Sequence, residues 1–219
     1  MKNRSFTVIE LLVVLVIISS LMLLVINFLK PSEFYRKSRD TRRIMDLNDL
    51  DLIISSIIYE DASLSLGATN TIYLSLPMDT NTSNCSIQYP ELPSLPPGWK
   101  YHCVSRSNLL NVDGTGWLPI PISNYKMINL TKLPIDPLNT PQYYYAYVAG
   151  GSYLLYAQLE DYKHQASKTD NDNYPHLYSV GTNKTLLDQA QGLVLYLPFE
   201  ENYGTTTKDY SGNNNNGTL

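Results

Sequence analysis

The chain opens with an apolar stretch, residues 6–29, which reads FTVIELLVVLVIISSLMLLVINFL and follows the short basic leader MKNRS, residues 1–5. A helix that rises about 1.5 Å per residue would span about 36 Å here, enough to cross a bilayer core of about 30 Å. We therefore predict a transmembrane helix. Its one charge is Glu10, and a carboxylate in lipid costs enough free energy to require a cationic partner.

The residues at the head of this stretch, SFTVIELLVVLVII, resemble the N-terminal signal of type IV pilins and of the related pseudopilins of type II secretion. The resemblance implies that a prepilin peptidase cleaves between Ser5 and Phe6 and methylates the new amino group of Phe6. It also implies that the Glu10 carboxylate faces the N-terminal amine of a neighbouring subunit in the filament core. The chain departs from the family at Ser5, where the family has Gly.

Two other interpretations of residues 1–29 stay open. A cleaved secretory signal has an apolar core of about 7–15 residues and a small-x-small cleavage site, whereas this core is longer and contains no Ala-x-Ala. In an ordinary signal anchor, Glu10 would lie near the lipid headgroups without a subunit partner.

The charge of the chain is unevenly distributed. The net charge is −4, but residues 44–219 carry eight basic and seventeen acidic side chains, a net −9. An acidic outer domain argues against a nucleic-acid partner, because nucleic-acid binding needs a basic face. Large domains translocate largely regardless of charge. We therefore expect a single pass through a bacterial cytoplasmic membrane, with the head outside, and later a pilus or pseudopilus in the periplasm or at the cell surface.

The predicted fold class is α+β, a pilin-like long N-terminal helix packed on a small antiparallel β head. Pro31 should interrupt the helix after its transmembrane half. Residues 30–66 then continue it as an amphipathic half, since apolar side chains recur at three- and four-residue steps. That stripe comprises Phe34, Ile44, Leu47, Leu50, Ile54, Ile57 and Ile58.

The start of this amphipathic half is basic, from Arg36 to Arg43. Three interpretations of the basic patch stay open. It contacts lipid headgroups, it contacts an acidic face of the next subunit, or it is a solvated charged face.

Residues 67–191 are expected to form the β-rich head. Residues 71–76 (TIYLSL) alternate as a short strand, and residues 77–97, rich in Pro, Ser, Asn and Thr, predict a surface loop. The clearest β signal is QYYYAYVAGGSYLLYAQLE, residues 142–160, in which two alternating runs flank Gly150-Gly151 and predict a hairpin. We interpret Asp136 as a turn former beside Asn139, with a calcium ligand as the alternative.

Cys85 and Cys103 are the only cysteines of the chain. Outside a bacterial membrane an isolated pair is more readily a disulfide than a metal site, which would need four ligands. The disulfide would stabilise the loop by roughly 3 kcal/mol. Two unpaired thiols are the alternative.

The last stretch, residues 192–219, reads GLVLYLPFEENYGTTTKDYSGNNNNGTL and resembles the opening strands of a concanavalin A-like (laminin G-like) lectin domain. Twenty-eight residues are a small part of a jelly roll, which needs well over about a hundred. We expect either an incomplete lectin domain or a flexible tail.

Catalytic patterns are weak throughout the chain. The three histidines, His102, His164 and His176, have no metal-ligand spacing. Glu200 and Glu201 are adjacent, so on a strand they would point to opposite faces and would not flank one glycosidic bond. We expect no enzyme activity, no cofactor and no metal site.

Together these features predict a structural subunit of a type IV pilus or type II secretion pseudopilus that polymerises through its N-terminal helix. Its partners would be other copies of the chain, related pilins, the prepilin peptidase, the inner-membrane assembly machinery and membrane lipid. The alternative is a membrane-anchored surface protein that binds carbohydrate through a lectin domain beginning at Gly192.

Overall fold

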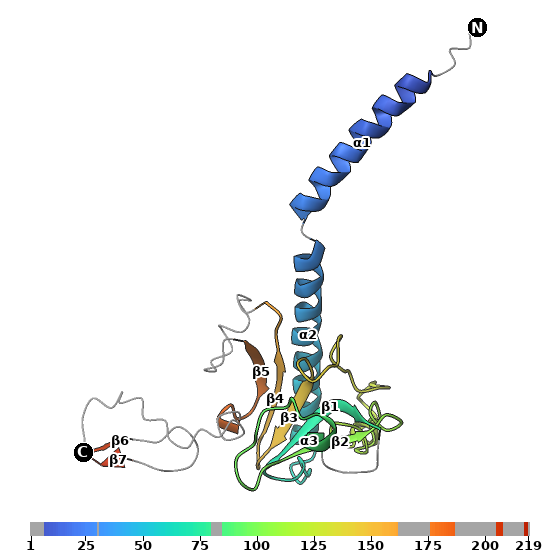
Figure 1. The fold of residues 1–219 in the computed structure, drawn as a ribbon. Helices are drawn as coiled ribbons and strands as arrows, with labels where there is room; N and C mark the ends of the chain where they lie inside the picture. Colours follow the sequence, from blue (N-terminus) through green and yellow to red (C-terminus); the bar gives the residue numbers. More distant parts are fainter. Residues whose placement is uncertain are drawn as a thin grey trace. The chain divides into compact units, whose positions relative to one another are not determined.

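The computed structural model describes residues 7–29, 31–79, 85–161, 176–186, 205–207 and 217–218, without the side chains of residues 24–29 and 31. Two compact units make up the chain, Met1–Arg39 and Asp40–Leu219. Figure 1 shows the order of the helices and strands.

The first unit contains helix α1 (Val8–Leu29) and the beginning of helix α2 (Pro31–Glu60). No proline or glycine interrupts α1, and α2 begins at a proline, whose missing N–H would be unpaired at the first helical position anyway. We predicted a transmembrane helix over residues 6–29. Within the described part of the chain, no helix combines the length and the apolar character that crossing a membrane requires.

The second unit buries one side of α2. Leu47, Leu50, Ile54 and Ile57 are at most 1% exposed, which agrees with the predicted stripe, but Phe34 is 70% exposed. Phe34 precedes Leu47 by thirteen residues, about 3.6 helical turns, and this spacing puts the two side chains on different sides of the helix.

Helix α2 ends at Glu60, whereas we predicted its end at residue 66. The reason is a local turn at Asp61. Its carboxylate accepts hydrogen bonds from the backbone N–H and the hydroxyl of Ser63, at 2.9 and 2.6 Å. Such side-chain-to-backbone bonds compete with the helical pattern.

A five-stranded sheet forms the centre of the head, in the order β2-β1-β3-β4-β5. Its strands are β1 (Thr71–Met78), β2 (Lys100–Ser105), β3 (Tyr145–Ala149), β4 (Tyr153–Gln158) and β5 (Leu177–Gly181). Three of the four strand pairs are antiparallel, but β1 and β2 are parallel. The prediction of an all-antiparallel head was wrong at this edge, because the long connection between β1 and β2 is a crossover, which parallel pairing requires.

Strands β3 and β4 form the predicted hairpin. Tyr145 pairs with Ala157 and Ala149 pairs with Tyr153, and Gly151 in the turn has a positive φ of 77°. Alternation along β3 sends Tyr145 and Tyr147 to one face of the sheet and Ala146 and Val148 to the other.

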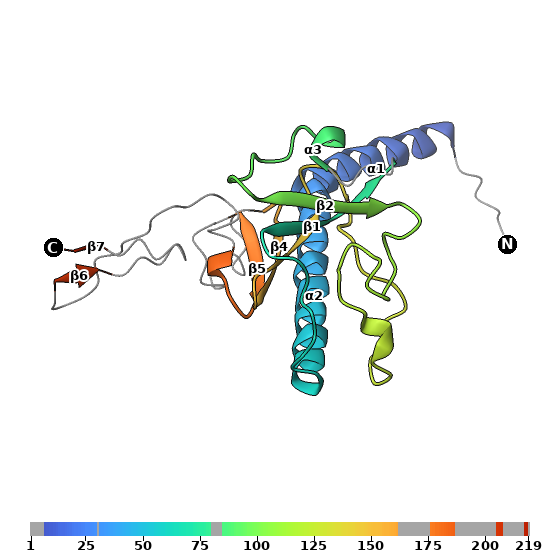
Figure 2. The same ribbon diagram turned by 90° about the horizontal axis from the view of Figure 1, so that it is seen from below.

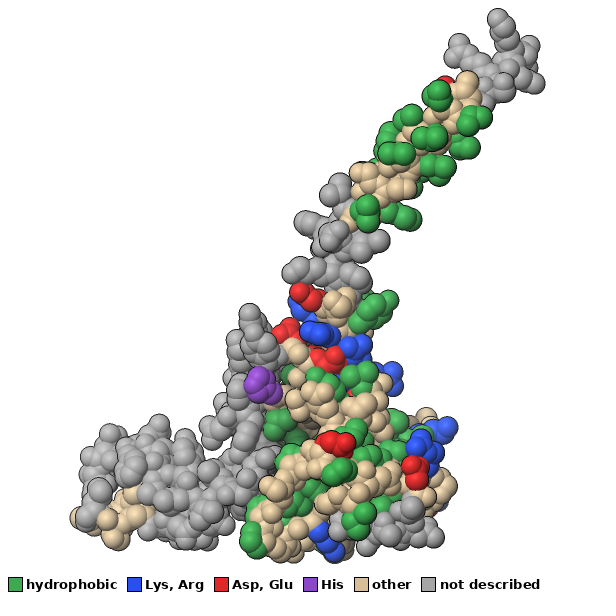
Figure 3. Space-filling model, viewed as in Figure 1, with side chains coloured by type: hydrophobic (Ala, Val, Ile, Leu, Met, Phe, Trp, Pro, Cys, Tyr) green, Lys and Arg blue, Asp and Glu red, His purple; other side chains and the backbone are tan. Residues whose placement is uncertain are grey.

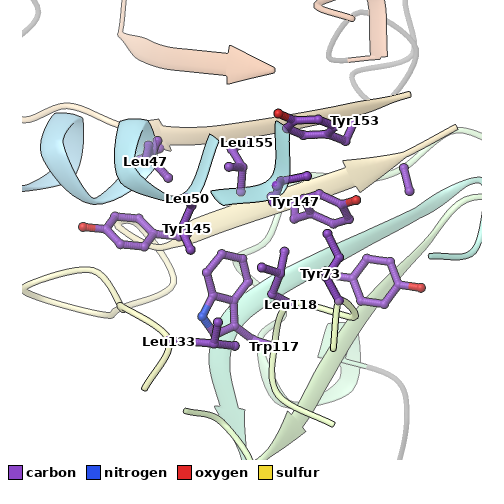
Figure 4. Close-up of a cluster of buried hydrophobic side chains, with 14 of the residues drawn as sticks. Leu47, Leu50, Tyr73, Trp117, Leu118, Leu133, Tyr145, Tyr147, Tyr153 and Leu155 are labelled. Carbon is purple, nitrogen blue, oxygen red and sulfur yellow. The ribbon is translucent and has the colours of Figure 1, made fainter. Parts of the chain in front are cut away.

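The larger core lies between α2 and the sheet. Figure 4 shows side chains from α2, β1, β3 and β4 in one cluster with Trp117, Leu118 and Leu133, which come from the connection between β2 and β3. That connection also contains a short 3-10 helix, η1 (Ile122–Asn124). Trp117 is fully buried and its indole N–H donates to the Pro134 carbonyl at 2.9 Å.

The other face of the sheet is covered by residues 85–99. We predicted a surface loop over residues 77–97, but β1 continues to Met78, and the segment contains helix α3 (Cys85–Gln88) and the buried Leu92. All eight residues of β1 are buried. A strand that is apolar on both faces needs a second cover, and this segment provides it (Figure 2).

Two short strands lie near the end of the chain, β6 (Thr206–Thr207) and β7 (Gly217–Thr218), which pair with each other in antiparallel fashion. Most of residues 192–219, on which the lectin resemblance depends, lie outside the described residues.

Candidate functional site

Glu10 and Thr7 form a capping box at the start of α1. The Glu10 carboxylate oxygen Oε2 accepts from the Thr7 backbone N–H and from the Thr7 hydroxyl, both at 2.9 Å. In return the Glu10 backbone N–H donates to Thr7 Oγ1 at 3.3 Å. These reciprocal bonds satisfy N–H groups that a helix start leaves without partners.

The carboxylate of Glu10 keeps one oxygen available as far as the described residues go. Its two hydrogen bonds to described residues both use Oε2, and the residue is exposed. Ser5 and Phe6, the predicted cleavage and methylation residues, lie outside the described residues. Glu10 is therefore the member of the predicted N-terminal site whose contacts are described. The capping box was not predicted, although the spacing Thr7-x-x-Glu10 is its known signature.

The apolar side chains of α1 are exposed over the part of the helix whose side chains are described. From Val8 to Leu23 the large ones are 42–82% exposed, and Figure 3 shows hydrophobic side chains on the surface of this part of α1. A continuous apolar surface of this kind marks a binding region for another apolar surface. A carboxylate with a free oxygen at its start suits a cation that arrives with that partner.

Arg43, predicted as part of an exposed basic patch, is instead fully buried in the second unit. Its guanidinium donates from Nε to Asp136 Oδ2 at 2.6 Å, from Nη2 to Asp136 Oδ1 at 3.0 Å, and from Nη1 to Asp40 at 2.7 Å and Glu160 at 2.8 Å. The Tyr143 ring lies 4.9 Å from the guanidinium carbon. Arg43 thus joins α2 to the turn at Asp136 and to Glu160, two residues after the end of β4.

Two of the three carboxylates around Arg43 accept further hydrogen bonds from backbone N–H groups. Asp40 accepts from the backbone N–H groups of Glu160 and Asp161, and Asp136 accepts from the N–H groups of Leu138 and Asn139. Burial by itself lowers the pKa of Arg43, but the bonds to Asp136, Glu160 and Asp40 outweigh it and raise the pKa above its ordinary value. The cluster therefore has a structural role, since it holds α2 against the segments that contain Asp136 and Glu160. The bonds of Asp136 to the following backbone agree with its interpretation as a turn former.

Tyrosine hydroxyls of the sheet make a second set of bonds to α2. Tyr145 donates to Asp46 at 2.8 Å, Tyr153 donates to Asp51 at 2.7 Å, and Tyr178 donates to Asn48 at 3.1 Å. The rings pack in the core while their hydroxyls reach polar groups on the helix, which a buried tyrosine needs. The sequence showed a tyrosine-rich hairpin but not these partners.

Cys85 and Cys103 form a disulfide between α3 and β2, and both residues are buried. The bond attaches the segment over residues 85–99 to the second face of the sheet. Among the described residues, no group of His, Cys, Asp and Glu side chains is arranged to hold a metal ion. His102 is half-buried beside Tyr73, His176 is exposed, and His164, Glu200 and Glu201 lie outside the described residues.

Comparison with known proteins gives one match. Residues 1–26 match the family model of the prokaryotic N-terminal methylation motif. No curated protein and no solved structure matches the chain. The matched residues include Ser5, Phe6 and Glu10, and they support a pilin-like or pseudopilin-like prepilin and a bacterial membrane or pilus location. The chain therefore carries a prepilin-type cleavage and methylation signal at its N-terminus.

Proposed function

We propose that this chain is a structural subunit of a type IV pilus or of a type II secretion pseudopilus, processed by a prepilin peptidase and polymerised through its N-terminal helix. The observation that carries the proposal is an exposed apolar helix whose one carboxylate, Glu10, stands within a matched methylation motif. The head contributes no catalytic step in this proposal, so the protein acts by assembly.

The precursor would be inserted in the bacterial cytoplasmic membrane through residues 6–29, with the head outside. Cleavage between Ser5 and Phe6 would then free the amino group of Phe6, which the peptidase methylates. Assembly with other copies and related pilins would need the inner-membrane assembly machinery. In the filament, apolar helices would pack on one another in place of lipid.

Glu10 would pair with the amine of Phe6 in a neighbouring copy. The capping box occupies Oε2, so Oε1 is available for the amine without loss of the helix start. Pairing removes the cost of an unpaired acid in an apolar environment, a gain that exists only in the assembled state.

Glu10→Gln and Glu10→Val test this role. The amide oxygen of Gln can still accept from Thr7, whereas Val removes the capping box as well. Because both variants lack the charge, we expect both to insert in the membrane and to lose filament assembly by at least about tenfold, as judged by sheared filaments. Normal filament yield from either variant would contradict the role of Glu10.

Intact-mass analysis of the membrane-extracted protein tests processing. We expect the loss of MKNRS and the gain of one methyl group on Phe6. A chain that keeps all five leader residues and remains a membrane monomer would overturn the proposed function. The lectin alternative stays a prediction, since most of residues 192–219 lie outside the described residues.

A further inference from the structure

The side of α2 that faces away from the sheet carries a regular row of exposed residues, which we call the outer seam. Met45, Leu52 and Tyr59 are 60%, 66% and 95% exposed, and they recur every seven residues. Seven residues are close to two helical turns, so these side chains lie on one side of the helix. With Arg42, Asp49 and Ser56, all exposed, the row follows the three- and four-residue steps of a helix-packing seam.

The outer seam is separate from the surface that holds the head together. The buried stripe of Leu47, Leu50, Ile54 and Ile57 occupies the opposite side of α2. Arg42 has a 3.6 Å ion pair with Asp46 and its side chain is 69% exposed. Asp49 is exposed and has no hydrogen-bond or ion-pair partner in the described part of the chain. These residues can therefore bind a partner without disturbing the core.

We propose that the outer seam docks on the outer seam of a second copy of this chain, parallel to it and shifted by one heptad, about 10 Å along the helix. The proposal rests on the proposed function, because copies inserted through the same N-terminal helix are parallel. Charge complementarity selects the shift. It brings Arg42 opposite the partner's Asp49, Met45 opposite the partner's Leu52 and Leu52 opposite the partner's Tyr59.

Other registers fit less well. Parallel copies without a shift place Arg42 against Arg42 and Asp49 against Asp49, and like charges that face one another are destabilising. An antiparallel pair centred on Leu52 places Asp49 near Ser56, so this carboxylate gains no cation. A one-heptad shift pairs unlike charges and repeats from copy to copy, so it extends a filament instead of closing a dimer.

Disulfide cross-linking in cells tests the register, because two cysteines bond only when their Cα atoms lie within about 7 Å. The native cysteines are bonded to each other and do not compete. Chains with Met45→Cys and chains with Leu52→Cys are expressed together, and we expect a mixed disulfide dimer. Each variant expressed alone should give little disulfide dimer. Leu52→Cys with Met127→Cys is the matched control, since Met127 is 92% exposed but lies outside α2.

The outcomes separate the possibilities. A mixed dimer at least about fivefold above the control supports the shift. Dimers from Leu52→Cys alone indicate an antiparallel or an unshifted parallel pair and overturn the one-heptad shift. The absence of the mixed dimer in both membranes and filaments also overturns it. If the chains are processed and found in filaments but give no mixed dimer, only the proposed docking of the outer seams is overturned. If the chains are neither processed nor assembled, the proposed function itself is overturned.

Charge reversal gives a second readout that loss of folding does not imitate. Arg42→Asp and Asp49→Arg should each lower the cross-link yield, by up to about fivefold for an exposed pair. The double variant Arg42→Asp/Asp49→Arg should restore it, and Lys126→Asp, on an exposed residue outside α2, should leave it unchanged. A double variant no better than the single ones would refute the pairing.

Discussion

At the residue scale, two charged side chains serve opposite purposes. Glu10, on an exposed helix, bonds the described residues through one of its two carboxylate oxygens, whereas Arg43 has its charge satisfied by three carboxylates in a buried site. The first is marked in the sequence as the lone charge of an apolar stretch. The second could not be predicted, because Asp136 and Glu160 are 93 and 117 residues away from Arg43 in the chain.

Removing Arg43 should destabilise the head strongly. Arg43→Met leaves three buried carboxylates without their cation, and breaking a buried ion pair in this way costs about 3–5 kcal/mol. Urea unfolding of the detergent-solubilised chain, followed by tryptophan fluorescence, measures the free energy of unfolding, since Trp117 is fully buried. Arg42→Met is the matched control, with a change within about 0.5 kcal/mol. Equal effects of the two variants would show that Arg43 does not join the elements as described.

At the scale of helices and strands, the burial of the central sheet depends on the segments that pack on its two faces. Strand β1 is buried on both faces because α2 lies against one face and residues 85–99 lie against the other. The composition of the segment that contains Cys85 indicated a surface loop. Its actual role follows from the apolar second face of the sheet, which must be shielded from water.

The disulfide should therefore stabilise more than a loop. The double variant Cys85→Ala/Cys103→Ala is expected to lower the free energy of unfolding by about 3 kcal/mol, since the closed loop has a sequence separation of 18. The same urea unfolding experiment measures this change in the free energy of unfolding. The single variant Cys103→Ala, which leaves a free thiol, serves as the comparison. If the urea midpoint of the double variant is unchanged, packing alone holds residues 85–99 on the sheet and the predicted role of the disulfide is wrong.

At the scale of the whole molecule, the head depends on buried tyrosines that are distributed over the sheet. Burial raises the pKa of Tyr144 to about 12. Burial is also the main cause that raises the pKa of Tyr145, Tyr147 and Tyr156 above the ordinary value. A phenol whose pKa is raised in the folded state contributes stability that is complete below its unfolded pKa of about 10 and is lost as the pH rises further.

The head should therefore unfold cooperatively in alkali. We expect stability to be constant with respect to these tyrosines up to about pH 10 and to fall between about pH 10 and 12. Tyrosinate absorbance and tryptophan fluorescence, recorded together along a pH titration, check this. We expect the part of the tyrosinate absorbance that comes from the buried tyrosines to rise together with the loss of native tryptophan fluorescence. Complete tyrosine ionisation near pH 10 while tryptophan fluorescence stays native would contradict the burial of these side chains.

The N-terminal signal, the helical stripe, the tyrosine hairpin and the α+β class can be predicted from the amino-acid sequence, because local order and periodicity encode each of them. Three features needed the folded structure: the parallel pairing of β2 with β1, the cover that residues 85–99 form over a sheet face, and the burial of Arg43 in the core. These features depend on contacts between residues far apart in the chain, which local patterns do not specify. The outer seam needs both kinds of information. The seven-residue spacing of its members can be read from the sequence, but their exposure is known only from the folded structure.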